Sequence, residues 1–318
     1  MARQVSERRA SIDVGTNSVR LLVGDVHPDG RVCALIRRGI VTRLGEGLDA
    51  TGRIADDPAE RTIQAILNVL QEARSAGARR VLLAATNALR AAGNGPEVAA
   101  RIEARTGLKV RVLSGHDEAR LVFRSLQAGR DADGPTITLD IGGGSTEFAA
   151  GYGTEMKFAL SLEVGCVRLY ERARARGGVE TPEGYAYARH ALAEELTAAA
   201  RVWGTEFHGA RIRGVGGTLT AFAMVHLAAR QYDPDRIEGT RMTSSEVARV
   251  SQRLRGMDAG ERRRWVGEGR ADLVPAGAAI LDEAVAHFGA PEVEVSTRGL
   301  RFGLLHEFPP LPPSDSEV

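Results

Sequence analysis

The chain opens with short runs of apolar residues separated by turn-forming residues, a pattern typical of neighbouring β-strands. These runs are Ser11–Val14, Leu21–Val26 and Val32–Ile36. An amphipathic stretch follows, in which Ile63 and Ile66 share one face at helical spacing. We expect Asp57 to cap this helix and Pro58 to open it, since proline is well tolerated in a first helical turn. A buried strand at Val81–Ala85 is predicted to come next.

The same order of predicted elements returns in the second half of the chain. Three further strand-like runs occupy Thr136–Asp140, Glu147–Ala150 and Met156–Leu160. Helices follow here too, because Thr243 and Glu246 have the spacing of a capping box. An apolar helix is predicted over Ala276–Phe288, with Gly289 ending it. Strands alternating with helices indicate a layered α/β fold, and the repetition indicates two similar halves.

The length of the chain favours two domains, because 318 residues exceed what one hydrophobic core usually serves. A stretch with loop composition at 129–135 lies between the two halves. We therefore expect a first domain over 1–128 and a second over 129–308, whose C-terminal part can pack back on the first. The Pro- and Ser-rich residues 309–318 are predicted to be a disordered tail.

Composition narrows the class of protein. Hydrophobic residues make up 43% and charged residues 26%, as in ordinary globular proteins, and no apolar run approaches the roughly 20 residues that span a bilayer. The polar N-terminus lacks a secretory signal, so we expect a cytoplasmic protein with no membrane partner. Cys33 and Cys166 are the only cysteines, which makes a disulfide framework or a cysteine zinc site improbable. Both are predicted to fill the core.

Charge argues against a general nucleic-acid binder, because the net charge is only +1. Only Lys109 and Lys157 are lysine among 42 basic residues, which leaves 40 arginines. The planar fork of arginine suits bidentate contacts to phosphate. We nevertheless interpret the arginine clusters as solvent-exposed faces that at most line a path for a polyanion. These clusters are Arg37-Arg38, Arg79-Arg80 and Arg262-Arg263-Arg264.

One short pattern occurs twice, 127 residues apart. Asp13–Ser18 and Asp140–Ser145 both have the form D-x-G-x-x-S, and each follows an apolar run. Glycines let backbone N–H groups approach an anion closely, hydroxyls add donors, and aspartate can hold a divalent cation. The two copies therefore predict one site, shared by both halves, for a phosphate chain with a metal ion.

A third glycine-rich element, Gly214–Thr218, follows a short strand-like run and precedes a predicted helix over Leu219–Ala229. A helix N-terminus at this place would direct free N–H groups toward an anion. Close packing of a strand against a helix explains the glycines equally well.

Taken together, the ordered motifs resemble the exopolyphosphatase and guanosine pentaphosphate phosphohydrolase family, a branch of the superfamily of actin, sugar kinases and chaperone ATPases. The resemblance runs from Asp13 to about Leu305. The motifs that carry it are Asp13–Ser18, Arg43–Gly47, Thr86–Arg90, Ser114–Ala119, Asp140–Glu147, Gly165–Leu169, Gly216–Thr218, Arg270–Asp272 and Ser296–Gly303.

The resemblance implies an α/β fold of two actin-like (ribonuclease H-like) domains with the active site in the cleft between them. It also implies magnesium-dependent release of the terminal phosphate from inorganic polyphosphate, from guanosine pentaphosphate, or from both. Relatives are commonly dimers, so a homodimer is a further expectation.

The resemblance assigns roles residue by residue. Glu118 matches the glutamate that orients or deprotonates the attacking water, and Asp140 and Glu147, with Glu118, match acids near the metal. Phosphate-binding positions are Gly15, Thr16, Asn17, Ser18, Arg90, Gly142, Gly143, Gly144, Ser145, Gly216, Gly217 and Thr218. The residues alone leave another explanation for Glu118, since an acid at the start of a helix also favours the helix dipole.

Some features depart from the family pattern. His116-Asp117 stands where further acids are common, and Asn87 stands in place of a small residue near Arg90. The chain resembles the short, two-domain form, which favours short polyphosphates or nucleotides as substrates. Two alternatives stay open: a kinase-like phosphotransferase using the same cleft, and a non-catalytic sensor that binds guanosine polyphosphates or ATP. A water-positioning acid at 118 favours a hydrolase over a sensor.

Overall fold

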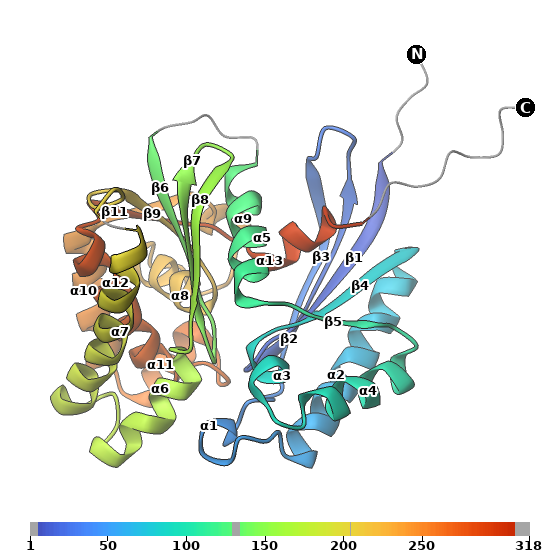
Figure 1. Cartoon of the computed structure of the whole chain (residues 1–318), viewed down its shortest axis with the longest axis horizontal. Coiled ribbons are helices and arrows are strands. Elements are labelled where there is room, and N and C mark those ends of the chain that lie inside the picture. Colours follow the sequence, from blue (N-terminus) through green and yellow to red (C-terminus); the bar gives the residue numbers. More distant parts are fainter. Residues whose placement is uncertain (1–5, 129–133, 204, 309–318) are drawn as a thin grey trace, which may run out of the picture.

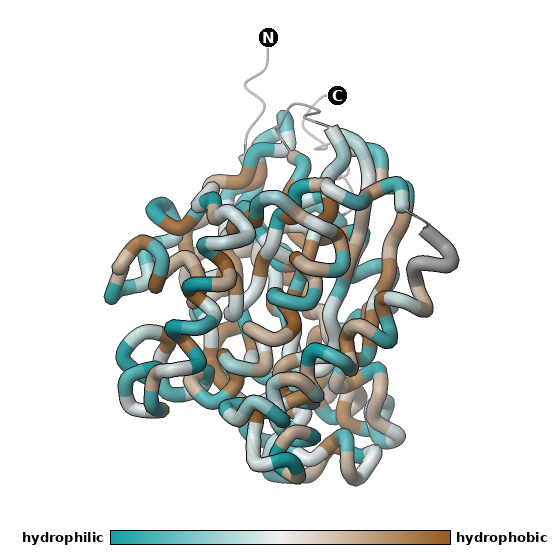
Figure 2. The backbone as a smooth tube through the Cα atoms, turned by 90° about the vertical axis from the view of Figure 1, so that its left-hand side faces the viewer, coloured by the Kyte–Doolittle hydropathy of each residue, from teal (hydrophilic) through white to brown (hydrophobic). Residues whose placement is uncertain are grey.

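The structure, a computed structural model, describes residues 6–128, 134–203 and 205–308. The predicted tail at 309–318 and most of the loop at 129–135 lie outside the described residues. Figure 1 shows two halves, each built around one sheet, with α5 (Gly115–Gln127) and α13 (Leu300–Leu305) between them. Figure 2 shows hydrophobic and hydrophilic residues alternating along the backbone, as amphipathic elements require when one face covers a core.

The first sheet has five strands in the order β3-β2-β1-β4-β5. Antiparallel pairing joins β1, β2 and β3, whereas β4 and β5 continue the sheet in parallel with β1. The strands are β1 (Glu7–Val14), β2 (Ser18–Val26), β3 (Val32–Val41), β4 (Arg80–Ala85) and β5 (Val110–Val112).

The second sheet repeats this arrangement, in the order β8-β7-β6-β9-β11, and adds β10 at its edge. Again three antiparallel strands are followed by parallel ones. The strands are β6 (Pro135–Ile141), β7 (Thr146–Tyr152), β8 (Glu155–Leu162), β9 (Arg211–Val215), β10 (Thr240–Thr243) and β11 (Glu292–Val295). The predicted repetition of strand order is confirmed, and the molecule has the two-domain actin-like fold.

Helices cover the two sheets and complete separate hydrophobic cores. In the first half these are α1 (Leu48–Thr51), α2 (Asp56–Ser75), α3 (Asn87–Ala91) and α4 (Gly95–Thr106). In the second half they are α6 (Cys166–Ala173), η1 (Arg174–Arg176), α7 (Pro182–Trp203), α8 (Gly217–His226), α9 (Pro234–Ile237), α10 (Ser244–Gly256), α11 (Ala259–Val266) and α12 (Val274–Phe288).

Two helices cross between the halves. α5 follows the first sheet along the chain but packs against β6, β7 and β8 of the second. α13 follows the second sheet but packs against α5, β1 and β2, where Ser11 Oγ donates to the carbonyl of Arg301 at 2.8 Å. The C-terminal part of the chain thus packs back on the first half.

Most predicted helix boundaries are close to the observed ones. The capping box of Thr243 and Glu246 is present, and Gly289 ends α12 with φ 58°. The expected cap at Asp57 is wrong, because Ala55 caps α2 and Asp57 lies in its first turn. There its carboxylate still faces the positive end of the helix dipole. α8 ends at His226, three residues before the predicted end.

Two further expectations are wrong. Cys33 is exposed on β3, an edge strand of its sheet, and does not fill the core. Arg262 is buried and donates to the carbonyls of Ala271 and Met257, so it holds a loop in place instead of facing solvent. Among the described residues, no helix is both long and apolar enough to span a membrane.

Candidate active site in the cleft between the two sheets

The two D-x-G-x-x-S turns meet in one cleft. The first joins β1 to β2 and the second joins β6 to β7, so equivalent hairpins of the two sheets present them. Each is closed by the same backbone hydrogen bond, from Gly15 N to Ser18 O and from Gly142 N to Ser145 O, both 3.0 Å. A Cβ on Gly143 would lie 3.1 Å from Thr16 Cβ, which shows how closely the two turns approach. All eight residues 15–18 and 142–145 line one inner pocket.

Acidic side chains line the same inner pocket. Asp13 and Asp140 sit at equivalent places near the ends of β1 and β6, Glu147 lies on β7, and Glu118 lies in the first turn of α5. Asp13, Glu118 and Glu147 are buried. The family resemblance implied Asp140, Glu147 and Glu118 as the acids near the metal and did not include Asp13, although the repeat places Asp13 where Asp140 stands in the second half.

Burial raises the pKa of each of these acids, and repulsion by a neighbouring acid raises it further for Asp140, Glu147 and Glu118. Burial dominates for Asp13 and raises the pKa of Asp140 to about 6. The pKa of Glu147 is raised by burial and then by Asp140, and that of Glu118 by burial and then by Glu147. Such a cluster of acids favours either bound protons or a bound cation.

The donor set fits a hard divalent cation. Carboxylate oxygens are what Mg²⁺ prefers, and Asp13 Oδ1 is buried without a hydrogen-bond partner among the described residues. Within the described ranges, however, no three His, Cys, Asp or Glu side chains converge into a complete metal cage. An Mg²⁺ ion here would therefore be held by one or two carboxylates and completed by substrate phosphates and water.

Arg90 lies behind Glu118. Its Nη1 donates to Glu118 Oε2 at 2.8 Å and to the carbonyl of Leu113 at 2.9 Å. Its Nη2 has no hydrogen-bond partner in the part of the chain that the structure describes and lies 3.9 Å from Glu163 Oε1. Arg90 thus orients Glu118, and its predicted contact with phosphate stays a prediction.

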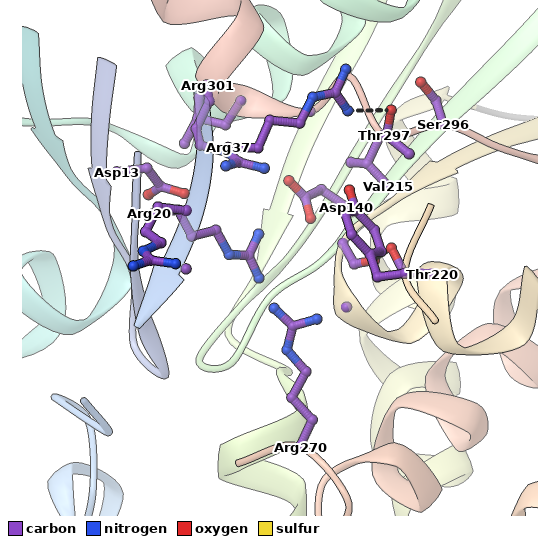
Figure 3. Close-up of a pocket in the computed structure, with 17 residues that line it drawn as sticks. Asp13, Arg20, Arg37, Asp140, Val215, Thr220, Arg270, Ser296, Thr297 and Arg301 are labelled. Atoms are coloured by element: carbon purple, nitrogen blue, oxygen red, sulfur yellow. Dashed lines mark hydrogen bonds between the residues drawn. The ribbon is translucent and has the colours of Figure 1, made fainter. Parts of the chain in front are cut away.

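The inner pocket continues into a wider outer pocket of about 290 Å³. Figure 3 shows Arg20 and Arg270 reaching into it from opposite sides, below Arg37 and Arg301. Burial and the neighbouring Arg20 lower the pKa of Arg270 and Arg301 to about 10, so both stay charged at neutral pH. With Arg38, five arginines line the outer pocket, against two acids, Asp13 and Asp140. Because positive charge is in excess, the outer pocket favours a polyanion.

Sequence reasoning missed most of the outer pocket. Arg37 and Arg38 line it, which agrees with the part of their interpretation that let them line a path for a polyanion, and the Arg38 side chain is 62% exposed. Arg20 is two residues past the first motif, and Arg270 and Arg301 belong to motifs quoted for the family resemblance. Their places beside or within these motifs were the signal from which the sequence could have predicted the outer pocket.

The third glycine-rich element lines the outer pocket through Gly216 and Gly217. Gly216 precedes α8 with φ +99°, and a Cβ there would lie 2.9 Å from Ile141 O. Close packing therefore requires glycine at this position. Gly217 also lines the outer pocket at the N-terminal end of α8, whereas a Cβ on Gly277 of α12 would lie 2.1 Å from Thr218 Oγ1. The structure thus supports both explanations of these glycines, close packing and a helix N-terminus that faces an anion site.

Ion pairs bridge the cleft below the turns. Asp49 on α1 accepts from Arg168 at 2.8 Å and from Arg172 at 2.7 Å, both on α6. Arg43 lies 3.6 Å from Asp272 on the opposite half. These contacts hold the two halves together around the site.

Comparison with known proteins places the chain among phosphatases. The Ppx/GppA phosphatase family matches residues 24–310. Exopolyphosphatase 2 of Mycobacterium tuberculosis is 33% identical over 287 residues, covering 87% of this chain and 89% of the relative. A solved Ppx/GppA family member from Aquifex aeolicus is 30% identical, with a TM-score of 0.77 and coverage of 94% and 96% of the two chains. An exopolyphosphatase from Cytophaga hutchinsonii, 23% identical with a TM-score of 0.83 and coverage of 94% and 97%, shares the fold.

Proposed function

This chain belongs to the Ppx/GppA phosphatase family, and we propose that it releases the terminal phosphate of inorganic polyphosphate, with water as the acceptor. The observation that carries the proposal is the junction of the two pockets. The inner pocket joins two phosphate-type turns to a cluster of acids, and the outer pocket continues it with five arginines. A chain of phosphates needs this continuity, whereas a single phosphate does not.

In the proposed reaction the terminal phosphate lies between the turns, where backbone N–H groups and hydroxyls neutralise its charge. Glu118 accepts a proton from the attacking water, and Arg90 fixes the orientation of that carboxylate. One or two of the carboxylates of Asp13, Asp140 and Glu147 would hold Mg²⁺, which would supply positive charge to the phosphate oxygens when bound. The remaining chain occupies the outer pocket.

Guanosine pentaphosphate is a second candidate substrate, and one residue favours it. Tyr232 lines the outer pocket with 49% of its surface exposed. Aromatic rings at such places can stack on a nucleobase, a contact worth about 1–3 kcal/mol. Polyphosphate has no group that would use it.

A direct assay tests the main proposal. The full chain is incubated with Mg²⁺ and with polyphosphates of several lengths, guanosine pentaphosphate or ATP, and released phosphate is measured. We expect release from polyphosphate, and a loss of about 10²- to 10⁴-fold in kcat for Glu118→Gln. Glu103→Gln, on α4 and outside both pockets, is the matched control. Equal phosphate release by wild type and Glu118→Gln would refute the role of Glu118, and binding without any release would favour the sensor alternative.

A further inference from the structure

Asn87 occupies a position in the cleft that the proposed reaction has not yet used. It is the first residue of α3, is 2% exposed, and lines the inner pocket together with Glu118 and Gly144. Its Oδ1 is buried and has no hydrogen-bond partner among the described residues. A Cβ on Gly144 would lie 2.1 Å from this oxygen, so the amide lies directly against the second phosphate-type turn.

The orientation of this amide is fixed from the opposite half of the molecule. Asn87 Nδ2 donates to Glu163 Oε2 at 2.8 Å, and Glu163 lies just after β8. An ionised carboxylate only accepts hydrogen bonds, so the NH₂ group must face Glu163 and the carbonyl oxygen must face away from it. Arg168 Nη2 holds Glu163 in turn at 2.7 Å.

The same carboxylate links Asn87 to the proposed base. Glu163 Oε1 lies 3.9 Å from Arg90 Nη2, and Arg90 Nη1 binds Glu118. Asn87 and Glu118 are thus two ends of one chain of polar contacts beside the inner pocket. One end offers a carboxylate and the other an unpartnered carbonyl oxygen.

The chemistry of the reactants selects the partner of that oxygen. A carbonyl oxygen accepts hydrogen bonds, whereas the ionised oxygens of a phosphate chain offer none. The reactant with protons to donate is water, and it has two. In the proposed reaction Glu118 accepts only one of these two protons.

We propose that Asn87 contacts the attacking water and, together with Glu118, fixes its orientation, with Glu163 as the positioning residue that sets the Asn87 amide. The inference rests on the proposed hydrolysis. The water oxygen forms a bond to the terminal phosphorus, and the bond from that phosphorus to the bridging oxygen breaks with its electron pair on the shortened chain. One water proton passes to Glu118, and the other stays on the new phosphate and is directed by Asn87 Oδ1 during attack.

The test compares kcat and KM for polyphosphate in wild type, Asn87→Ala, Glu163→Gln and the double variant. We expect Asn87→Ala to lower kcat by about 10²-fold with KM for polyphosphate and for Mg²⁺ unchanged, because a misoriented nucleophile costs rate and not binding. Glu163→Gln leaves the Asn87 amide free to flip and should lower kcat less. The double variant should be no slower than Asn87→Ala, since Glu163 binds Asn87 Nδ2 by a hydrogen bond at 2.8 Å, whereas it lies 3.9 Å from Arg90 Nη2, beyond hydrogen-bond distance.

Glu171→Gln is the matched control, because Glu171 is also an interdomain carboxylate and accepts a hydrogen bond from Gly47 N at 3.0 Å. If Asn87→Ala does not fold, as judged by its thermal midpoint, Asn87→Ser and the surface variant Glu163→Gln carry the test. Unchanged kcat in an active enzyme, a rise in KM for Mg²⁺ alone, or additive losses in the double variant would each overturn the inference. Absence of hydrolysis in wild type would instead refute the proposed function.

Discussion

Single residues set the charge balance of the cleft. Asp13, Asp140 and Glu147 line one pocket with Glu118, and all but Asp140 are buried, so solvent screens their negative charges poorly. Five arginines next to them carry the opposite charge but line the outer pocket. The inner end therefore favours a cation and the outer end a polyanion, and each would make the other easier to bind.

The raised pKa values predict how pH affects stability without metal. The pKa of Asp140 is about 6 in the folded protein, against about 3.9 in an unfolded chain, so folding favours the protonated form. This contribution is complete below about pH 4 and is lost as pH rises through about 6. We expect the thermal unfolding midpoint of the metal-free protein to decrease as the pH rises from 5 to 8. The decrease should be less steep in Asp140→Asn. Adding Mg²⁺ at pH 8 should raise the wild-type midpoint more than that of the variant.

Calorimetric or fluorescence melts at several pH values, with and without Mg²⁺, measure this effect. Glu103→Gln serves again as a variant outside the cleft and should follow wild type. Identical pH slopes for wild type and Asp140→Asn would show that the acid cluster does not control the pH dependence.

Elements were predictable where their signals are local. The strand runs, the capping box at Thr243 and the end of α12 at Gly289 each depend on residues only a few positions apart. The D-x-G-x-x-S repeat was also sufficient to bring two distant turns to one cleft, because both occupy the same place in equivalent hairpins. The outer pocket was not predictable in this way. Its arginines lie on β2, on β3, in the loop before α12, and on α13. Only the tertiary arrangement brings these four segments together.

Thr243 offers a test of stability apart from activity. Its side chain accepts from Glu246 N, and Glu246 accepts from Thr243 N at 2.8 Å, which completes the capping box of α10. Thr243→Ala should reduce the free energy of unfolding by about 1 kcal/mol, because helix N–H groups lose their partner. Urea denaturation measures the change. Phosphate release per folded molecule should stay at the wild-type value. Ser244→Ala, at the first position of the helix, is the control, because Ser244 donates through its backbone N–H to Pro291 O and that bond survives the substitution.

At the scale of the whole molecule, contacts across the cleft stabilise the closed arrangement. Asp49 pairs with both Arg168 and Arg172, and these arginines lower the pKa of its carboxyl group. Opening the cleft would break these pairs while leaving both cores intact, because α1 and α6 belong to different halves.

Asp49→Asn should therefore shift the substrate-free protein toward an open form. Such a partly exposed pair contributes about 1 kcal/mol or less, so the shift in population is up to roughly fivefold. Small-angle X-ray scattering should give a larger radius of gyration for the variant without substrate, and polyphosphate with Mg²⁺ should reduce the difference. Asp29→Asn, in the exposed turn between β2 and β3, is the control. Equal radii in every condition would mean that the Asp49 pairs do not govern closure.

The return of α13 to the first sheet bears on the order in which the protein is built. Domains generally fold from the N-terminus as the chain leaves the ribosome, yet β1 and β2 form hydrogen bonds with Arg301 and Leu305 of α13, which follows the whole second sheet in the chain. One face of the first sheet must wait uncovered until α13 has been synthesised, after every strand of the second sheet. Arg301 also lines the outer pocket, so a nascent chain cannot have a complete site before that moment.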